Sequence, residues 1–299
     1  MRARRWAGVA VLGAGLMAMA GCAVNKPVAE VTMFSQAVGA VETASEPLLD
    51  DLSAADKVQG QRAYRATART KDLVLTNYGT SRVEGFDPSY AYYYSSLSDS
   101  QAVLALRGGL RAVRSYADVL TLMAGDGNLD QARGELASIG TNLLSLAGLA
   151  TTALPGVDAA LGALKGVIDE ALSAANAQEL RRIVLAGAPQ VKAVVAALRN
   201  GSAAMFRSLT FDASNAFDTA ANPAAAQAAA RQIDGYRVAV SDYVVLLDRV
   251  SQALDQLVAS YQTPSNPYTL ANLAERSAAL GADAQAWRRA YAALRRGGN

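Results

Sequence analysis

Apolar residues recur along residues 233–261 in alternating steps of three and four. The positions are Ile233, Tyr236, Val240, Tyr243, Leu247, Val250, Leu254, Leu257 and Tyr261. Residues that repeat every 3.5 positions stay on one face of an α-helix, so this spacing predicts a helix with a continuous apolar seam. At 1.5 Å per residue the seam is about 42 Å long, and its period favours neighbouring helices that cross at about 20°.

The same spacing recurs in residues 103–120 and 129–146, and apolar positions at helical intervals continue through most of the chain. Glycine, proline and asparagine separate the helical segments. The predicted breaks are 80–96, 125–128, 155–156, 222–223 and 263–267. No segment shows a convincing strand alternation. We therefore predict an all-α fold, an elongated antiparallel helical bundle with coiled-coil-like packing.

Two prolines fall inside helical pattern. Pro47 is expected to kink or restart the first helix, since an interior proline removes a hydrogen bond and clashes with the preceding turn, and Pro189 is expected to kink a later one. Leu73 and Tyr78 continue the helical spacing of the first segments. We therefore expect helix as far as Gly79.

Alanine, glycine and serine occupy many positions in and beside the seams, most densely at 224–230. Small side chains let helices approach closely, but they bury less apolar area, at about 25 cal/mol per Å2. Helices with such small side chains must be long to bury enough apolar area, which favours an elongated bundle over a globular enzyme. We assign the bundle to residues 30–299, with a candidate sub-boundary near 151–157.

The N-terminus has the three parts of a secretory signal: a basic head, an apolar run over residues 6–20 and a small residue at Gly21. The run contains about 15 residues, whereas a bilayer span needs roughly 20. We therefore predict that residues 1–21 are a signal peptide and not a membrane-spanning helix.

Residues 19–22 read Met-Ala-Gly-Cys, which resembles the lipobox of bacterial lipoproteins, with Met19 in place of the usual leucine. In that family a signal peptidase cleaves before a cysteine that carries a diacylglyceryl thioether. The resemblance implies that Cys22, the only cysteine, is lipidated and that residues 22–29 tether the bundle to a membrane. Because Ala23 is not aspartate, the resemblance also implies sorting to the outer membrane, where we expect the periplasmic face.

Charge limits the class of partner. Residues 1–21 contain three of the 28 basic residues and none of the 26 acidic ones, so the remaining chain carries 25 basic against 26 acidic residues. Phosphate binding relies on clustered Lys and Arg, and this balanced chain has no basic run. We therefore expect no nucleic-acid partner. The expected contacts are the membrane, through lipid on Cys22, and an envelope protein.

Candidate catalytic chemistry is sparse because the chain has no histidine. That removes the usual base near neutral pH and the commonest metal ligand, and lipidation of Cys22 would remove the thiol. Residues 126–130 have the opening spacing of a calcium loop, but Gln131 replaces its glycine and Ala137 its bidentate glutamate, so we interpret the segment as a turn between helices. We expect no enzyme activity, metal or cofactor.

Adjacent carboxylates are a further candidate for acid–base chemistry. They occur as Asp50 with Asp51 and as Asp169 with Glu170. Neighbouring helix positions diverge by about 100°, so neither pair points at one substrate bond. Solvated helix faces explain both pairs.

One segment gathers aromatic residues in a chain that is only 6% aromatic. Its members are Phe86, Tyr90, Tyr92, Tyr93 and Tyr94. Tyrosines in a connecting loop offer rigid contact area together with hydroxyl groups, as at many interaction sites. We consider two interpretations: the segment covers one end of the bundle core, or it is an exposed contact for a protein or a glycan.

These features predict a lipid-anchored envelope protein that acts as a non-enzymatic helical scaffold or adaptor for an envelope partner. One alternative is a module that sequesters an apolar ligand between helices. Another is an immunity or inhibitor lipoprotein that blocks a toxin or an envelope enzyme.

Overall fold

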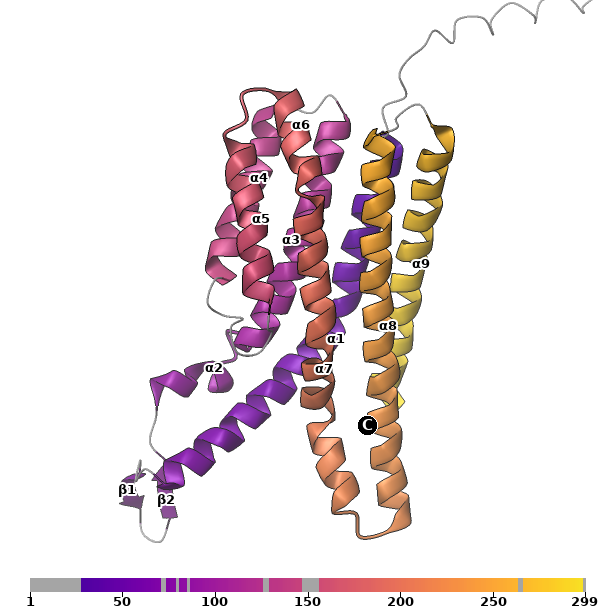
Figure 1. Cartoon of the computed structure of the whole chain (residues 1–299). Helices are drawn as coiled ribbons and strands as arrows, with labels where there is room; N and C mark the ends of the chain where they lie inside the picture. Colours follow the sequence, from indigo (N-terminus) through magenta and orange to yellow (C-terminus); the bar gives the residue numbers. More distant parts are fainter. Residues whose placement is uncertain are drawn as a thin grey trace, which may run out of the picture.

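The computed structural model describes residues 28–70, 74–78, 81–84, 87–125, 129–146, 156–262 and 266–297. Long helices lie side by side, as predicted for an all-α helical bundle (Figure 1). They are α1 (Val28–Thr70), α3 (Gln101–Ala124), α4 (Leu129–Leu146), α5 (Val157–Leu172), α6 (Ala177–Ala186), α7 (Ala188–Asp218), α8 (Pro223–Gln262) and α9 (Pro267–Gly297). The shorter elements are β1 (Val74–Tyr78), β2 (Ser81–Glu84), the 3-10 helix η1 (Pro88–Tyr90) and α2 (Ala91–Tyr94).

Two groups of helices share the central helix α7. In one group α7 contacts α3 and α5, and α4 packs on α3 and α5. In the other group α7 contacts α1 and α8, and α9 packs on α1 and α8, while α1 also lies along α3 (Figure 1). One continuous core joins the groups. It contains Leu106 and Leu136, which precede residues 151–157, together with Leu164 and Tyr243, which follow them.

Helix α8 forms from the predicted apolar seam. Asn222 precedes the helix, and its side-chain oxygen accepts a hydrogen bond from the backbone N–H of Ala225 at 2.9 Å, which satisfies one of the free donors of the first turn. The middle of the seam is buried, whereas Ile233 and Tyr236 are half-buried. The buried seam residues are Val240, Tyr243, Leu247, Val250, Leu254, Leu257 and Tyr261.

The expectation of helix up to Gly79 is wrong. Helix α1 ends at Thr70, and β1 pairs antiparallel with β2, with Tyr78 opposite Ser81. Valine, threonine and tyrosine, which β1 contains, are favoured in strands, whereas Leu73 and Gly79 lie outside the described residues. Helical spacing alone did not detect this preference over so short a segment.

The two interior prolines have different outcomes. Helix α1 continues across Pro47 without a restart. At Pro189 the chain has already ended α6 and begun α7, so this proline lies in the first helical turn, where its missing N–H costs nothing. At its start, α1 begins at Val28, inside the predicted tether of residues 22–29.

Candidate functional site

The tyrosine cluster, formed by Tyr64, Tyr90, Tyr92, Tyr93 and Tyr94, lies on α1, η1 and α2 at the end of the molecule opposite to Val28 (Figure 1). We call that end, made by residues 54–70, 88–97 and 208–236, the distal end. The Tyr64 side chain is buried, and its ring centroid lies 5.0 Å from that of Tyr90 and 5.8 Å from that of Tyr94. The rings of Tyr90 and Tyr93 are 6.0 Å apart. Such tilted and edge-on pairs are the favoured aromatic geometries.

Polar contacts hold α2 against α1. Lys57 Nζ donates a hydrogen bond to the carbonyl of Ser95 at 3.0 Å, and Gln61 Nε2 donates to the carbonyl of Tyr93 at 2.8 Å. Between them lies Gly60, where an added Cβ would come within 2.1 Å of the Tyr93 ring. The segment thus packs on the part of α1 that extends beyond the main core, because Tyr64 is separate from that core.

The outer side of the same segment is exposed. Tyr92 is 48% exposed, Tyr94 is 45% exposed and Leu97 is 95% exposed. Val58, which follows Lys57 in α1, is 38% exposed. Tyr90 and Tyr93 are half-buried. The prediction for Phe86 falls outside the described residues. The cluster therefore has an inner side that packs on α1 and an outer side of apolar and hydroxyl groups available for contact.

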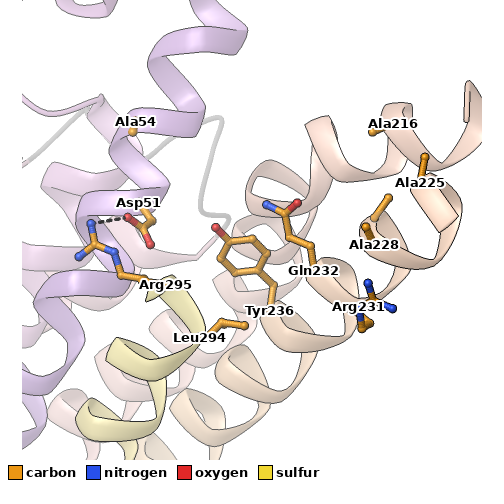
Figure 2. A pocket seen from close by; sticks show the side chains of 11 residues that line it. Asp51, Ala54, Ala216, Ala225, Ala228, Arg231, Gln232, Tyr236, Leu294 and Arg295 are labelled. Atoms are coloured by element: carbon orange, nitrogen blue, oxygen red, sulfur yellow. Dashed lines mark ion pairs between the residues drawn. The ribbon is translucent and has the colours of Figure 1, made fainter. Parts of the chain in front are cut away.

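An open groove of about 870 Å3, the distal groove, separates α1 from the α7–α8 turn (Figure 2). Alanines from three helices make much of its wall, because the long alanine-rich start of α8 extends past the end of α9. Polar and larger side chains from α1, α8 and α9 complete the lining (Figure 2). The lining residues are Asp51, Ala54, Ala216, Ala225, Ala228, Ala229, Arg231, Gln232, Tyr236, Leu294 and Arg295.

The polar wall of the distal groove is centred on Asp51. Its carboxylate accepts a hydrogen bond from Tyr291 Oη at 2.7 Å and pairs with Arg295 Nη2 at 3.2 Å (Figure 2). Burial raises the pKa of Tyr291, and the hydrogen bond to Asp51 raises it further. Burial, followed by the nearby Asp51 charge, also raises the pKa of Tyr236. Both phenols therefore stay protonated near neutral pH, and Tyr291 serves as a hydrogen-bond donor, not as a base.

The adjacent carboxylates point to different helices. Asp50 pairs with Arg107 of α3 at 2.7 Å, whereas Asp51 contacts Tyr291 of α9. Their divergence matches the 100° step between neighbouring helix positions. Asp169 makes a local ion pair with Lys165 on α5. Asp50 and Asp51 therefore do not aim at one point; Asp50 instead shares the Arg107 guanidinium with Glu46 and Asp99.

Trp287 of α9 has a structural place. Trp287 is buried, and its Nε1 donates a hydrogen bond to the carbonyl of Ala239 at 3.1 Å. Three residues of the calcium-loop pattern, 126–128, lie outside the described residues. Within the described ranges no cluster of acidic or other metal-binding side chains is arranged to hold a metal ion. In the same ranges no helix combines the length and apolar character needed to cross a membrane.

The sequence did not predict the distal groove or the contacts of Asp51 with α9. The alanines at 224–230 suggest close helix packing from their size alone, but several of them line a groove where α8 extends beyond the end of α9 (Figure 1). Comparison with protein-family models, with curated proteins and with solved structures finds no match. The functional argument therefore depends on the residues of this chain.

Proposed function

We propose that this chain is a lipid-anchored envelope protein whose helical body acts as a non-enzymatic scaffold or adaptor, with the tyrosine cluster as its contact for an envelope partner. The observation that carries the proposal is the position of Tyr92, Tyr94 and Leu97, which are exposed at the distal end of the molecule. The partner would be a protein, since tyrosine is enriched at protein interfaces and the exposed Leu97 adds apolar contact area.

The resemblance of residues 19–22 to a lipobox supports an anchor close to α1. Only six residue steps separate Cys22 from Val28. Extended chain covers about 3.5 Å per residue, so the start of α1 would lie within about 21 Å of the lipidated cysteine. Two acyl chains hold a protein at a membrane far more firmly than one.

Helix α1 supports contact at a distance from that anchor. Tyr64 follows Val28 by 36 residues in the same helix, which corresponds to about 54 Å at 1.5 Å per residue. An anchored molecule standing on its α1 start would present the tyrosine cluster well away from the bilayer. This arrangement suits a protein whose task is to reach a partner.

The chemistry of the chain supports contact over catalysis. There is no histidine, and Cys22 would be consumed by the lipid. Asp50 and Asp51 engage separate helices, and the phenols of Tyr236 and Tyr291 remain protonated near neutral pH. Each of these groups serves packing or hydrogen bonding more readily than proton transfer.

Site-specific photocrosslinking in cells tests the contact. A photoreactive phenylalanine analogue replaces Tyr92 in one strain and Tyr268 in another. Tyr268 is a matched control because it is also an exposed tyrosine, at 78%, but lies at the start of α9, away from the distal end. We expect a discrete protein adduct from position 92 and none from position 268.

Adducts of the same protein from both positions, or from neither, would contradict the distal contact. Tyr92→Ala combined with Tyr94→Ala should remove the partner without lowering the melting temperature. A marked loss of stability in that variant would instead give the two tyrosines a structural role.

The anchor is tested separately with Cys22→Ser. We expect this variant to lose incorporation of labelled fatty acid and to leave the membrane fraction, because the thiol that carries the acyl chains is gone. A variant that still fractionates with membranes and still incorporates label would contradict the lipid anchor.

The distal groove favours a second candidate function, the holding of an apolar ligand. Its volume of about 870 Å3 is within the usual range of ligand sites, and alanines form much of its wall. A fluorescent naphthylamine probe should bind the purified protein, and Ala228→Trp should block binding by filling the groove. Ala279→Trp, at an exposed position of α9 outside the groove, is the control. Equal binding by all three proteins would exclude this function.

A further inference from the structure

Helix α8 carries a second stripe on its solvent side, separate from the buried seam. Val238 is 61% exposed and Val245 is 47% exposed, and seven residues separate them. Asp242 lies between them at steps of four and three, so all three side chains share one helix face. Apolar residues seven positions apart are typical of a helix face on which another helix packs.

A groove accompanies this stripe where α8 meets α9. Two adjoining cavities of about 290 and 250 Å3 share Asp242, Trp287 and Ala290 as lining residues. The buried Trp287 lines both cavities, and Ala286 and Ala290 line the α9 side together with Asp283, Tyr291 and Leu294. Asp283 is paired with Arg249 of α8, which lines the same groove. Small residues on one wall and exposed valines on the other leave room for a helix to approach both.

The charges on α8 distinguish Asp242 from its neighbours. Three other aspartates of this helix have cationic partners: Asp234 pairs with Arg237, Asp248 with Arg199 and Asp255 with Lys192. Asp242 forms no ion pair with any described residue, and the surrounding side chains raise its pKa by desolvation alone. The groove thus presents an uncompensated carboxylate midway between two exposed valines.

We propose that the groove lined by Val238, Asp242, Val245, Trp287, Ala286 and Ala290 docks an amphipathic helix of a partner protein. The helix would carry apolar side chains seven residues apart, with an arginine or lysine between them. The apolar side chains would cover the two valines, and the cation would pair with Asp242. This inference goes beyond the proposed function, because it requires neither the lipid on Cys22 nor the tyrosine cluster.

A second copy of the chain fits the groove less well than a basic partner helix. A symmetric antiparallel pairing of two α8 helices through Val238 and Val245 would bring Asp242 close to the two-fold axis. The two carboxylates would then face one another, and like charges at the centre of an interface are unfavourable. Charge complementarity therefore selects a cationic partner.

Two synthetic helical peptides of about three heptads test the inference. Both carry leucine at two positions seven residues apart, with either arginine or glutamate between these leucines. Binding to the purified protein is followed by fluorescence anisotropy of the labelled peptides. We expect the arginine peptide to bind at least about tenfold more tightly, equivalent to about 1.4 kcal/mol.

Variants of the protein assign the effect to this groove. Asp242→Asn should abolish the preference for arginine, and Asp242→Lys should reverse it, whereas Asp218→Asn on α7 should leave it intact. Val238→Ser with Val245→Ser should weaken binding of both peptides by about tenfold or more, and Val58→Ser, an exposed valine of α1, should not.

Equal affinity for the two peptides, or binding of neither, would overturn the inference. So would a dimer in sedimentation experiments that Val238→Ser and Val245→Ser dissociate, because a second copy would then occupy the groove. Melting temperatures of the variants close to that of the parent protein exclude loss of folding as the cause.

Discussion

The bundle and the distal end are built from the same helices but are held together differently. Within the bundle, α1 buries Leu48 and Leu49 completely in the common core. Beyond Ser53 the same helix buries Tyr64 against α2 and is otherwise half-exposed or exposed at the described side chains. One continuous helix therefore packs in the core over its first half, whereas residues 54–70 extend beyond the core as an arm.

Polar contacts join α1 to α7 at the distal end. Arg62 pairs with Asp212 of α7, and Gln59 Nε2 donates a hydrogen bond to the carbonyl of Ser208 at 2.9 Å. Exposed ion pairs contribute about 0–1 kcal/mol each, much less than burial of a leucine. Because this end is less tightly packed, tyrosine, valine and leucine side chains stay exposed. Exposed apolar patches are typical of surfaces that bind partners.

The largest effect should come from the bundle half of α1. Leu48→Ala removes a fully buried side chain and should lower the free energy of unfolding by about 3 kcal/mol, because it leaves a cavity in the core. Val58→Ala in the distal half should cost less than about 0.5 kcal/mol. Urea denaturation followed by circular dichroism measures both. Similar losses from the two variants would contradict the division between core and arm.

An intermediate and local effect is expected from Gly60→Ala. The added Cβ would lie 2.1 Å from the Tyr93 ring, so α2 must move away from α1 while the bundle stays intact. Hydrogen exchange should accelerate in residues 88–95 and remain unchanged in α3. Gly281→Ala is the control, because its nearest neighbour atoms lie at 4.0 Å, and the better helix propensity of alanine should stabilise α9 by up to about 1 kcal/mol.

Accelerated exchange throughout the protein after Gly60→Ala would mean that the distal end is part of the same cooperative unit as the bundle. Unchanged exchange in residues 88–95 would mean that α2 accommodates the methyl group. Either result would require a different account of how the tyrosine cluster is held.

Local patterns predicted the bundle because its helices are long and strongly periodic. The spacing from Val240 to Leu257 needs no knowledge of the rest of the chain, and each of its members proved buried. The error at residues 74–78 has the opposite cause, since a few apolar residues cannot distinguish a helix turn from a short strand. The boundary before Pro189 depends on where α6 ends, and the local spacing of apolar residues does not show that position.

The candidate sites were less predictable because they arise between helices. Sequence identified the tyrosines from their density, but their inner and outer sides depend on Gly60 and Tyr64 of a separate helix. The distal groove requires α8 to extend beyond α9, and the contact of Asp51 with Tyr291 spans 240 residues. Such long-range pairs have no local signature.

The smallest effect on stability is expected from a substitution of Asp56, which lies where α1 extends beyond the bundle core. Its carboxylate accepts a hydrogen bond from Ser100 Oγ at 2.8 Å, and Ser208 of α7 also contacts it. Burial raises the pKa of Asp56 above its ordinary value of 3.8, although the two serine hydrogen bonds oppose that shift. A raised pKa means that the folded state holds the proton more tightly than the unfolded state.

The stabilisation linked to that proton is therefore fully present below pH 3.8 and is lost as the pH rises through the raised pKa of Asp56. Asp56→Asn keeps an oxygen acceptor for Ser100 and removes the buried charge, so it should stabilise the protein at pH 7 by less than about 1 kcal/mol. The gain should shrink as the pH falls toward 3.8. Melting curves at pH 4 and pH 7, with Asp218→Asn as a control on α7, measure the difference. A loss of stability at pH 7 would show that the Asp56 charge itself holds the arm to the bundle.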